Sequence, residues 1–329
     1  MAEVAGERES YTLVVRKPTF GLPTACPSCL PVYLYFRFAN LPFQMDFNLT
    51  YPDSDQIPYV EFGDYVAYNN EKGGVIDRLK EEGIVDLDID LNSVPEWISI
   101  KAMVSSWLSD AIVYELWVGN DGSSAQKIYC SDLPWPIGKV LTLKQIHAIK
   151  QQLGINKSNA EQREEEIYRR ANIAYGALST RLGDQSFFFE SRASSLDAIF
   201  LGQALVTLHA LPDTSILRSK LLEHDNLVRF AERIKTEFVD SGPSYSVPHV
   251  HTDPSSSSAP RKGPSNWRSK PKTKPPKREK TKEEKTFRRR AKYFVAAQLV
   301  AVFLFLTLMG RPEDADVDLD DDDEGYLND

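Results

Sequence analysis

The chain has 329 residues, with 39 Lys and Arg against 47 Asp and Glu and three cysteines. So few cysteines argue against a disulfide framework and fit a reducing compartment. The formal net charge of −8 says little about partners, because residues 1–260 carry −11, residues 261–292 carry +12 and residues 293–329 carry −9.

Residues 1–85 predict a β-α-β-β-β-α order of elements. The first ten residues contain neither an apolar signal-peptide core nor the basic character of a transit peptide, so we expect the folded part to stay in the cytosol. Pro27 suits the first turn of a helix, Gly63 suits a hairpin turn, and Gly83 ends the last helix. The apolar patterns predict strands at residues 11–15, 43–48, 57–62 and 65–67, and helices at residues 29–39 and 75–82.

Three short motifs in this block occur in the order of a known fold. They are Cys26-Pro-Ser-Cys29 at the start of the first helix, Asn40-Leu-Pro-Phe43 before the second strand and Ile57-Pro58-Tyr-Val60 at the third. With its element order, the block resembles the thioredoxin-like N-terminal domain of the glutathione transferase superfamily. The resemblance implies a cis peptide bond between Ile57 and Pro58, because that fold carries a cis-proline where its third strand begins.

The Cys26-Pro-Ser-Cys29 motif has two interpretations. At a helix N-terminus the helix dipole lowers the pKa of a thiol, so the pair could perform thiol–disulfide exchange. Alternatively, Cys26 and Cys29 are small, partly buried residues without a chemical role. Pro31 in the first turns of the helix favours this second interpretation. The superfamily also binds the γ-glutamyl group of glutathione with an acidic residue followed by Ser, and neither Asn69-Asn70 nor Lys72-Gly73 provides that pair.

Residues 86–241 predict an all-helical half. Helices are expected at residues 94–118, 161–182 and 195–211, with one helix or a bent pair at residues 217–238. Ser194 and Asp197 form a capping box, which also starts the central buried helix in the C-terminal domain of glutathione-transferase-like proteins. Three tryptophans recur every ten residues and are interpreted as core residues rather than as the lining of a partner groove: Trp97, Trp107 and Trp117. Three histidines lie in helix-like stretches without metal-ligand spacing and are interpreted as ordinary residues: His147, His209 and His224.

Residues 242–286 predict a disordered basic tether, because they are rich in Gly, Pro, Ser and Lys and lack apolar periodicity. A polybasic segment beside a membrane span is attracted to anionic headgroups. Nucleic-acid binding is the other use of such a run, but aromatic residues are not interleaved here apart from Trp267. The Pro248-His-Val-His251 stretch offers only two metal ligands, so we interpret it as a solvated linker.

Residues 293–309 form an uncharged run that predicts a tail anchor. Seventeen helical residues rise about 26 Å, slightly less than a bilayer core of about 30 Å. A buried core helix is the alternative, but the run lies between a basic stretch and an acidic tail. The excess of Lys and Arg in residues 261–292 predicts that the N-terminal side stays cytosolic and that residues 311–329 cross. Those last residues are interpreted as a solvated end or, alternatively, as an acidic lure for basic presequences.

Two stretches make the resemblance more specific, residues 187–205 around Ser-Ser-Leu-Asp-Ala and residues 222–234 around Asn-Leu-Val-Arg-Phe. With the two-cysteine motif and the anchor, the chain resembles the metaxins, most of all the plant type. The resemblance implies a non-enzymatic, glutathione-transferase-like protein of the mitochondrial outer membrane that serves protein import and β-barrel assembly. It implies as partners precursor proteins, including β-barrel precursors, subunits of the sorting and assembly machinery and the lipid bilayer, but no nucleic acid. It provides no catalytic, cofactor-binding or metal-binding residue and no cofactor.

The sequence therefore predicts an α/β plus all-α fold with a single C-terminal transmembrane helix and a receptor or scaffold function. The alternatives are a membrane-anchored, glutathione-dependent thiol transferase using Cys26 and a protein of mitochondrial morphology. The expected parts are a thioredoxin-like domain (1–85), an all-helical domain (86–241), a disordered basic tether (242–286), a basic flank with the anchor (287–310) and an acidic tail (311–329). The folded domains are expected to face the cytosol and the tail the intermembrane space.

Overall fold

The computed structural model of the chain describes residues 11–48, 55–134, 137–189, 192–240 and 298. The chain divides into two units, Met1–Pro248 and His249–Asp329, and the fold described below belongs to the first. Within the described ranges, no helix has the length and apolar character that a membrane span requires. Except for Gln298, the span expected at residues 293–309 lies outside these ranges, as does the tether.

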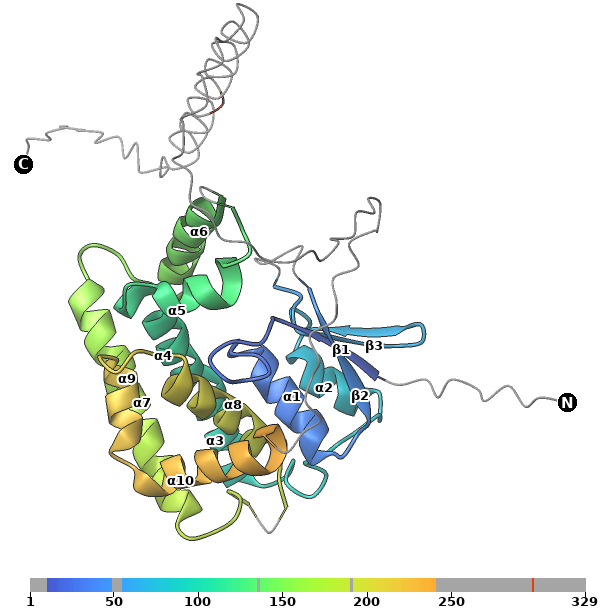
Figure 1. Ribbon diagram of the computed structural model, residues 1–329. Helices are drawn as coiled ribbons and strands as arrows, with labels where there is room; N and C mark the ends of the chain where they lie inside the picture. The colour runs from blue at the N-terminus through green and yellow to red at the C-terminus, as the bar shows by residue number, and fades with distance from the viewer. Residues whose placement is uncertain (1–10, 49–54, 135–136, 190–191, 241–297, 299–329) are drawn as a thin grey trace, which may run out of the picture. The chain divides into compact units, whose positions relative to one another are not determined.

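The N-terminal half contains a four-stranded sheet (Figure 1) with the strand order β2-β1-β3-β4. β1 runs parallel to β2, and the chain crosses between them through α1. β1 pairs antiparallel with β3, which forms a hairpin with β4. The expected element order and the cis peptide bond between Ile57 and Pro58 are confirmed. The bounds are β1 Tyr11–Val15, α1 Cys29–Phe38, β2 Phe43–Phe47, β3 Tyr59–Phe62, β4 Tyr65–Tyr68 and α2 Gly74–Glu81.

Helix α1 is buried along its first eight residues, and its proline has a packing role. Pro31 lies in the first turn, where a backbone N–H has no intrahelical partner to lose. Its ring lies directly against Gly202, since a Cβ placed on that glycine would be only 2.6 Å from the ring carbons. Pro31 therefore fits α1 closely against the second half of the protein.

The C-terminal half is all-helical, as expected, and its central helix is α8 (Ser195–His209). α8 is buried over nearly its whole length and packs against α1. The Ser194–Asp197 capping box is present. The other expected helices are found as α3 (Pro95–Met103) and α4 (Ser109–Tyr114), which π-helical turns join and extend to Gly119, and as α7 (Ala160–Leu182), α9 (Ile216–Leu222) and α10 (Asp225–Ile234).

The pattern at residues 217–238, interpreted as one helix or a bent pair, corresponds to the pair α9 and α10. They are separated at Glu223 and His224, and a π-helical turn, Lys235–Asp240, follows α10. Trp97 and Trp117 are buried in the core, as expected. Trp107 is only partly buried, and the Arg170 guanidinium lies 5.9 Å from its ring centre.

Two helices were missed by the sequence analysis. They are α5 (Ser123–Ala125), which continues into a π-helical turn to Cys130, and α6 (Ile137–Gln152). α6 lacks a clean apolar stripe, because Ile137 and Leu143 are exposed whereas Ile149 is buried. The π-helical turn after α5 and the helix α6 both line the cavity described below.

Candidate functional site

A cavity of about 270 Å³ lies between the thioredoxin-like half and the helical half. The first half contributes Arg16 from the end of β1, Cys26 from the loop before α1, and Asn69 from the segment after β4. The second half contributes Trp117, Tyr129 and Cys130. The cavity is thus assembled from residues more than a hundred positions apart, and it contains two of the three cysteines.

Cys26 lies at the beginning of α1, where its backbone carbonyl accepts hydrogen bonds from the N–H groups of Cys29 and Leu30, both at 3.1 Å. The Tyr129 hydroxyl donates to the Cys26 Sγ at 3.7 Å. Above the ring of Tyr129 lies the buried Arg16 guanidinium, 5.1 Å from the ring centre. The other neighbour of Tyr129 is the Trp117 ring, at a centroid distance of 5.1 Å.

These neighbours change the acidity of the Cys26 thiol. Burial alone would raise its pKa, but the Cys29 thiol, the Arg16 charge and the Tyr129 hydroxyl stabilise the thiolate and lower the pKa to about 6. The pKa of the Cys29 thiol is raised well above its ordinary value by burial and by the adjacent Cys26. Burial and the adjacent Cys26 also raise the pKa of Tyr129, so its hydroxyl remains a donor.

Neither of the two pairs that could correspond to the superfamily's γ-glutamyl position, Asn69-Asn70 and Lys72-Gly73, contains an acidic residue followed by Ser. The side-chain amide of Asn69 donates to the Asp55 carbonyl at 3.3 Å, and that of Asn70 donates to the Asp55 carboxylate at 3.5 Å. The backbone N–H of Asn69 donates to the Gln56 carbonyl at 3.1 Å. These amides stabilise the loop before the cis-proline, but they provide neither the carboxylate nor the hydroxyl of the acidic-Ser pair.

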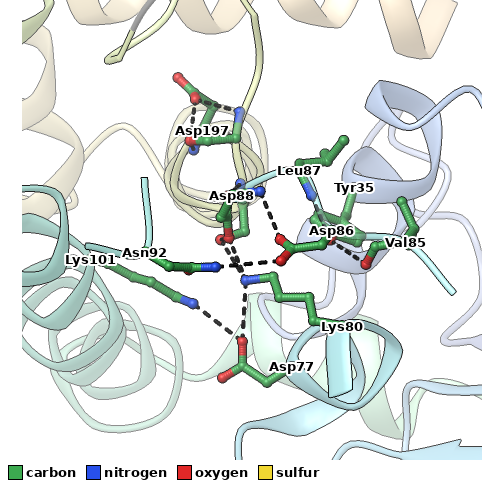
Figure 2. Close-up of polar contacts among 12 residues, drawn as sticks. Tyr35, Asp77, Lys80, Val85, Asp86, Leu87, Asp88, Asn92, Lys101 and Asp197 are labelled. Carbon is green, nitrogen blue, oxygen red and sulfur yellow. Dashed lines mark hydrogen bonds and ion pairs between the residues drawn. The ribbon is translucent and has the colours of Figure 1, made fainter. Parts of the chain in front are cut away.

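A second buried polar region, the Lys80–Asp88 network, consists of Asp77, Lys80, Asp88, Lys101 and Ser195. Figure 2 shows the Lys80 ammonium between the carboxylates of Asp88 and Asp77. Asp88 is completely buried, and it also accepts hydrogen bonds from the backbone N–H and the hydroxyl of Ser195, at 2.8 and 2.5 Å. Lys101 donates to Asp77 at 3.2 Å. The network therefore connects α2, the segment after it, α3 and α8.

The network determines the protonation of its lysines. Burial lowers the pKa of Lys80, but the neighbouring Asp88 and Asp77 outweigh burial and raise it. For Lys101, burial and the nearby Lys80 charge lower the pKa. The Trp97 ring lies 5.0 Å from the Lys101 ammonium and 5.9 Å from that of Lys80. The arrangement pairs opposite charges and joins the two halves of the fold.

Three histidines were interpreted as ordinary residues. His147 is exposed on α6, His209 lies 3.0 Å from the Glu232 carboxylate, and His224 packs near the Tyr175 ring. Among the described residues, no three His, Cys, Asp or Glu side chains are placed to hold a metal ion. The sequence analysis missed Arg16, Tyr129 and Trp117 as neighbours of Cys26. No local motif indicates this grouping, because the residues meet only through the fold.

Two known domain families match the chain. The glutathione S-transferase N-terminal domain matches residues 27–122, and the glutathione S-transferase C-terminal domain matches residues 171–234. The fold and these matches define a glutathione-transferase-like protein, with its cavity at the junction of the two halves.

Curated relatives identify the family more closely. The chain is 54% identical over 321 residues to the "Mitochondrial outer membrane import complex protein METAXIN" of Arabidopsis thaliana, covering 97% of this chain and 99% of that protein. It is 26% identical to human Metaxin-2 over 64% of this chain and 81% of that protein. Mouse Metaxin-1 is 25% identical over 65% of this chain and 71% of that protein. The chain belongs to the metaxin family.

Proposed function

We propose that the chain is a non-enzymatic receptor or scaffold in protein import at the mitochondrial outer membrane. The similarity that carries this proposal extends over 97% of the chain, to a relative named as a protein of the outer-membrane import complex. The match therefore includes the C-terminal residues beyond the two transferase-like halves. In this proposal the folded unit faces the cytosol, residues 293–309 span the membrane and the acidic tail lies in the intermembrane space.

The fold supports binding rather than glutathione chemistry. Neither Asn69-Asn70 nor Lys72-Gly73 provides the acidic residue and Ser of the superfamily, and the side chains of Asn69 and Asn70 bond to Asp55. The Lys80–Asp88 network and the Pro31–Gly202 contact fix the two halves against each other, so the folded unit presents a preorganised surface. We propose precursor proteins, including β-barrel precursors, and subunits of the sorting and assembly machinery as its partners.

The proposed anchor at residues 293–309 would hold the folded unit at the membrane. A module confined to the membrane meets membrane-bound partners at an effective concentration set by its tether, without any additional contact. A basic segment at residues 261–292 would add attraction to anionic headgroups. Weak contacts of the folded unit could therefore be sufficient for function at the membrane and insufficient in solution.

The experiment is to delete residues 293–309 and measure β-barrel assembly in isolated mitochondria. We expect assembly to decrease, with the variant folded but no longer in the membrane fraction. A matched control replaces the same residues with an unrelated apolar span of seventeen residues and should restore assembly. Unchanged assembly with a folded variant that has left the membrane would contradict the proposal.

A glutathione-dependent thiol transferase using Cys26 is the second candidate, favoured by the cavity and the lowered pKa of that thiol. It requires glutathione affinity. If this candidate is correct, calorimetry with the purified protein and millimolar glutathione detects binding, and Cys26→Ser abolishes turnover. Because neither Asn69-Asn70 nor Lys72-Gly73 provides an acidic residue followed by Ser, we expect no binding, and measurable affinity would reverse the order of the two candidates.

A further inference from the structure

Cys26 and Cys29 have no task in a receptor or scaffold, yet their surroundings are chemically unusual. Cys26 lines the cavity, and the buried Cys29 thiol interacts with the Cys26 thiol through a hydrogen bond. A buried guanidinium and a partly buried phenol from two other parts of the chain complete the group, Arg16 and Tyr129. The Cys26 Sγ therefore borders a cavity and is surrounded by a second thiol and by two side chains that stabilise its thiolate.

We propose that Cys26 is a site of reversible oxidation by peroxides, and that Cys29 is the thiol that resolves the oxidised sulfur into a Cys26–Cys29 disulfide. The cavity has room for hydrogen peroxide, because its volume of about 270 Å³ far exceeds the roughly 10–15 Å³ of cavity that one water molecule needs. The proposal is independent of the import role, since the modification needs neither a precursor nor the membrane.

The chemistry balances with a peroxide as the oxidant. The Cys26 thiolate attacks one oxygen of hydrogen peroxide, the O–O bond breaks, and the products are Cys26 sulfenic acid and hydroxide. The Cys29 sulfur then attacks the Cys26 sulfur, the S–O bond breaks, and the sulfenic oxygen leaves as water with the thiol proton. Two sulfur atoms are oxidised to a disulfide, and the peroxide is reduced to water and hydroxide.

The roles of the two cysteines differ because their surroundings differ. The charge of Arg16 and the hydroxyl of Tyr129 favour the thiolate at Cys26, whereas burial keeps Cys29 protonated. The nucleophile is therefore Cys26, and Cys29 provides the second sulfur. The same groups stabilise the reduced pair relative to the disulfide, so a disulfide formed here should be easily reduced again.

Cys130 is an internal reference, because it lines the same cavity. Its Sγ is 3.6 Å from the Thr142 hydroxyl, whereas Arg16 and Tyr129 act on Cys26. Because the groups that stabilise a thiolate lie at Cys26, we expect Cys26 to be oxidised several-fold faster than Cys130 at pH 6.

The experiment treats the reduced, full-length protein in detergent with hydrogen peroxide at pH 6, alkylates the remaining thiols and maps the peptides by mass spectrometry. We expect a Cys26–Cys29 disulfide that dithiothreitol reduces. Cys130 should remain a thiol during the peroxide treatment and should therefore be found alkylated. In Cys29→Ala, where no resolving thiol remains, dimedone should label Cys26 as a sulfenic acid. This mapping of the unmodified chain does not depend on any variant folding.

Three outcomes would overturn the proposal. Oxidation of Cys130 as fast as Cys26 would show that only access to the cavity matters. A Cys26 that stays reduced in the unmodified chain would show that the thiolate is not attacked. A stable mixed disulfide of Cys26 with added glutathione disulfide, formed in preference to the Cys26–Cys29 bond, would remove Cys29 as the resolving thiol and support the transferase instead.

Discussion

Two buried polar regions join the halves of this metaxin, and they differ in what their charges face. In the Lys80–Asp88 network, carboxylates and ammonium groups contact one another and the Ser195 hydroxyl. At the cavity, the charge of Arg16 acts on a nucleophilic sulfur, and that sulfur borders open space. The first arrangement uses charge to hold the fold together. The second places charge where a reagent can reach it.

This difference separates two kinds of sensitivity to mutation. Removing one partner of a buried, mutually paired network leaves an uncompensated charge, so stability should suffer most. Removing a group beside the cavity should change reactivity more than stability, because the cavity already leaves part of that surface without protein contacts. The predictions below test this division, beginning with the largest expected effect.

Asp88→Ala should lower the free energy of unfolding by about 3–5 kcal/mol, because it leaves the Lys80 ammonium buried without its closest carboxylate. Denaturation by urea, followed by tryptophan fluorescence, measures the change. Trp97 lies 5.9 Å from the Lys80 ammonium and provides a local signal.

The matched control is Asp90→Ala, two residues away. The side chains of Asp90 and its partner Arg192 are 66% and 50% exposed. Removal of such a surface pair should cost no more than about 1 kcal/mol. Equal effects of the two substitutions would show that the network is not a buried junction.

Gly202→Ala should cost about 1–3 kcal/mol, because overpacking forces side chains or backbone to shift. The added Cβ would lie 2.6 Å from the Pro31 ring, where α1 meets α8. In the double variant with Pro31→Ala, the two effects should be strongly non-additive, since the same contact is relieved. Thermal unfolding of the four proteins of this cycle provides the test.

Gly176→Ala is the control for helix propensity. No described atom lies within 4 Å of a Cβ built on this glycine of α7. The substitution should therefore be neutral or stabilise the helix by about 0.5–1 kcal/mol. A comparable loss in both glycine variants would indicate a general effect of alanine rather than the contact with Pro31.

Much of the fold could be predicted because its signals are local. The strands follow apolar runs, the start of α8 follows the Ser194–Asp197 box, and the cis peptide bond at Pro58 follows a family motif. α6 could not be predicted in this way, because its exposed Leu143 and buried Ile149 do not form a continuous stripe. Helical periodicity identifies a helix only where one face is consistently buried.

The site was less predictable than the fold, because it depends on long-range contacts. Cys26 and Cys29 were visible as a motif, but Tyr129 is 103 positions from Cys26. Pro31 was interpreted as evidence against a redox loop, whereas the structure shows its contact with Gly202. A residue unsuited to one local role can thus be required by a partner that the sequence does not reveal.

Tyr129→Phe should change stability less than Asp88→Ala or Gly202→Ala do, and it should have a clear effect on reactivity. The phenol donates to the Cys26 Sγ at 3.7 Å, so its loss disfavours the thiolate and raises the pKa of Cys26 above its value of about 6. The Phe ring keeps the contact with Arg16, which isolates the hydroxyl as the variable. The pH dependence of iodoacetamide alkylation at Cys26 measures the shift.

In the unmodified chain the alkylation rate should rise through pH 6, because the reactive thiolate forms above the pKa. In Tyr129→Phe the midpoint should move upward by on the order of half a unit to one unit, since one unit corresponds to about 1.4 kcal/mol. Thr142→Val, which removes the hydroxyl beside Cys130, should leave the Cys26 profile unchanged. An unchanged midpoint in Tyr129→Phe would assign the acidity of Cys26 to Cys29 and Arg16 alone. The pKa of the Cys26 thiol would then be set by residues of the thioredoxin-like half alone, without a contribution from the helical half.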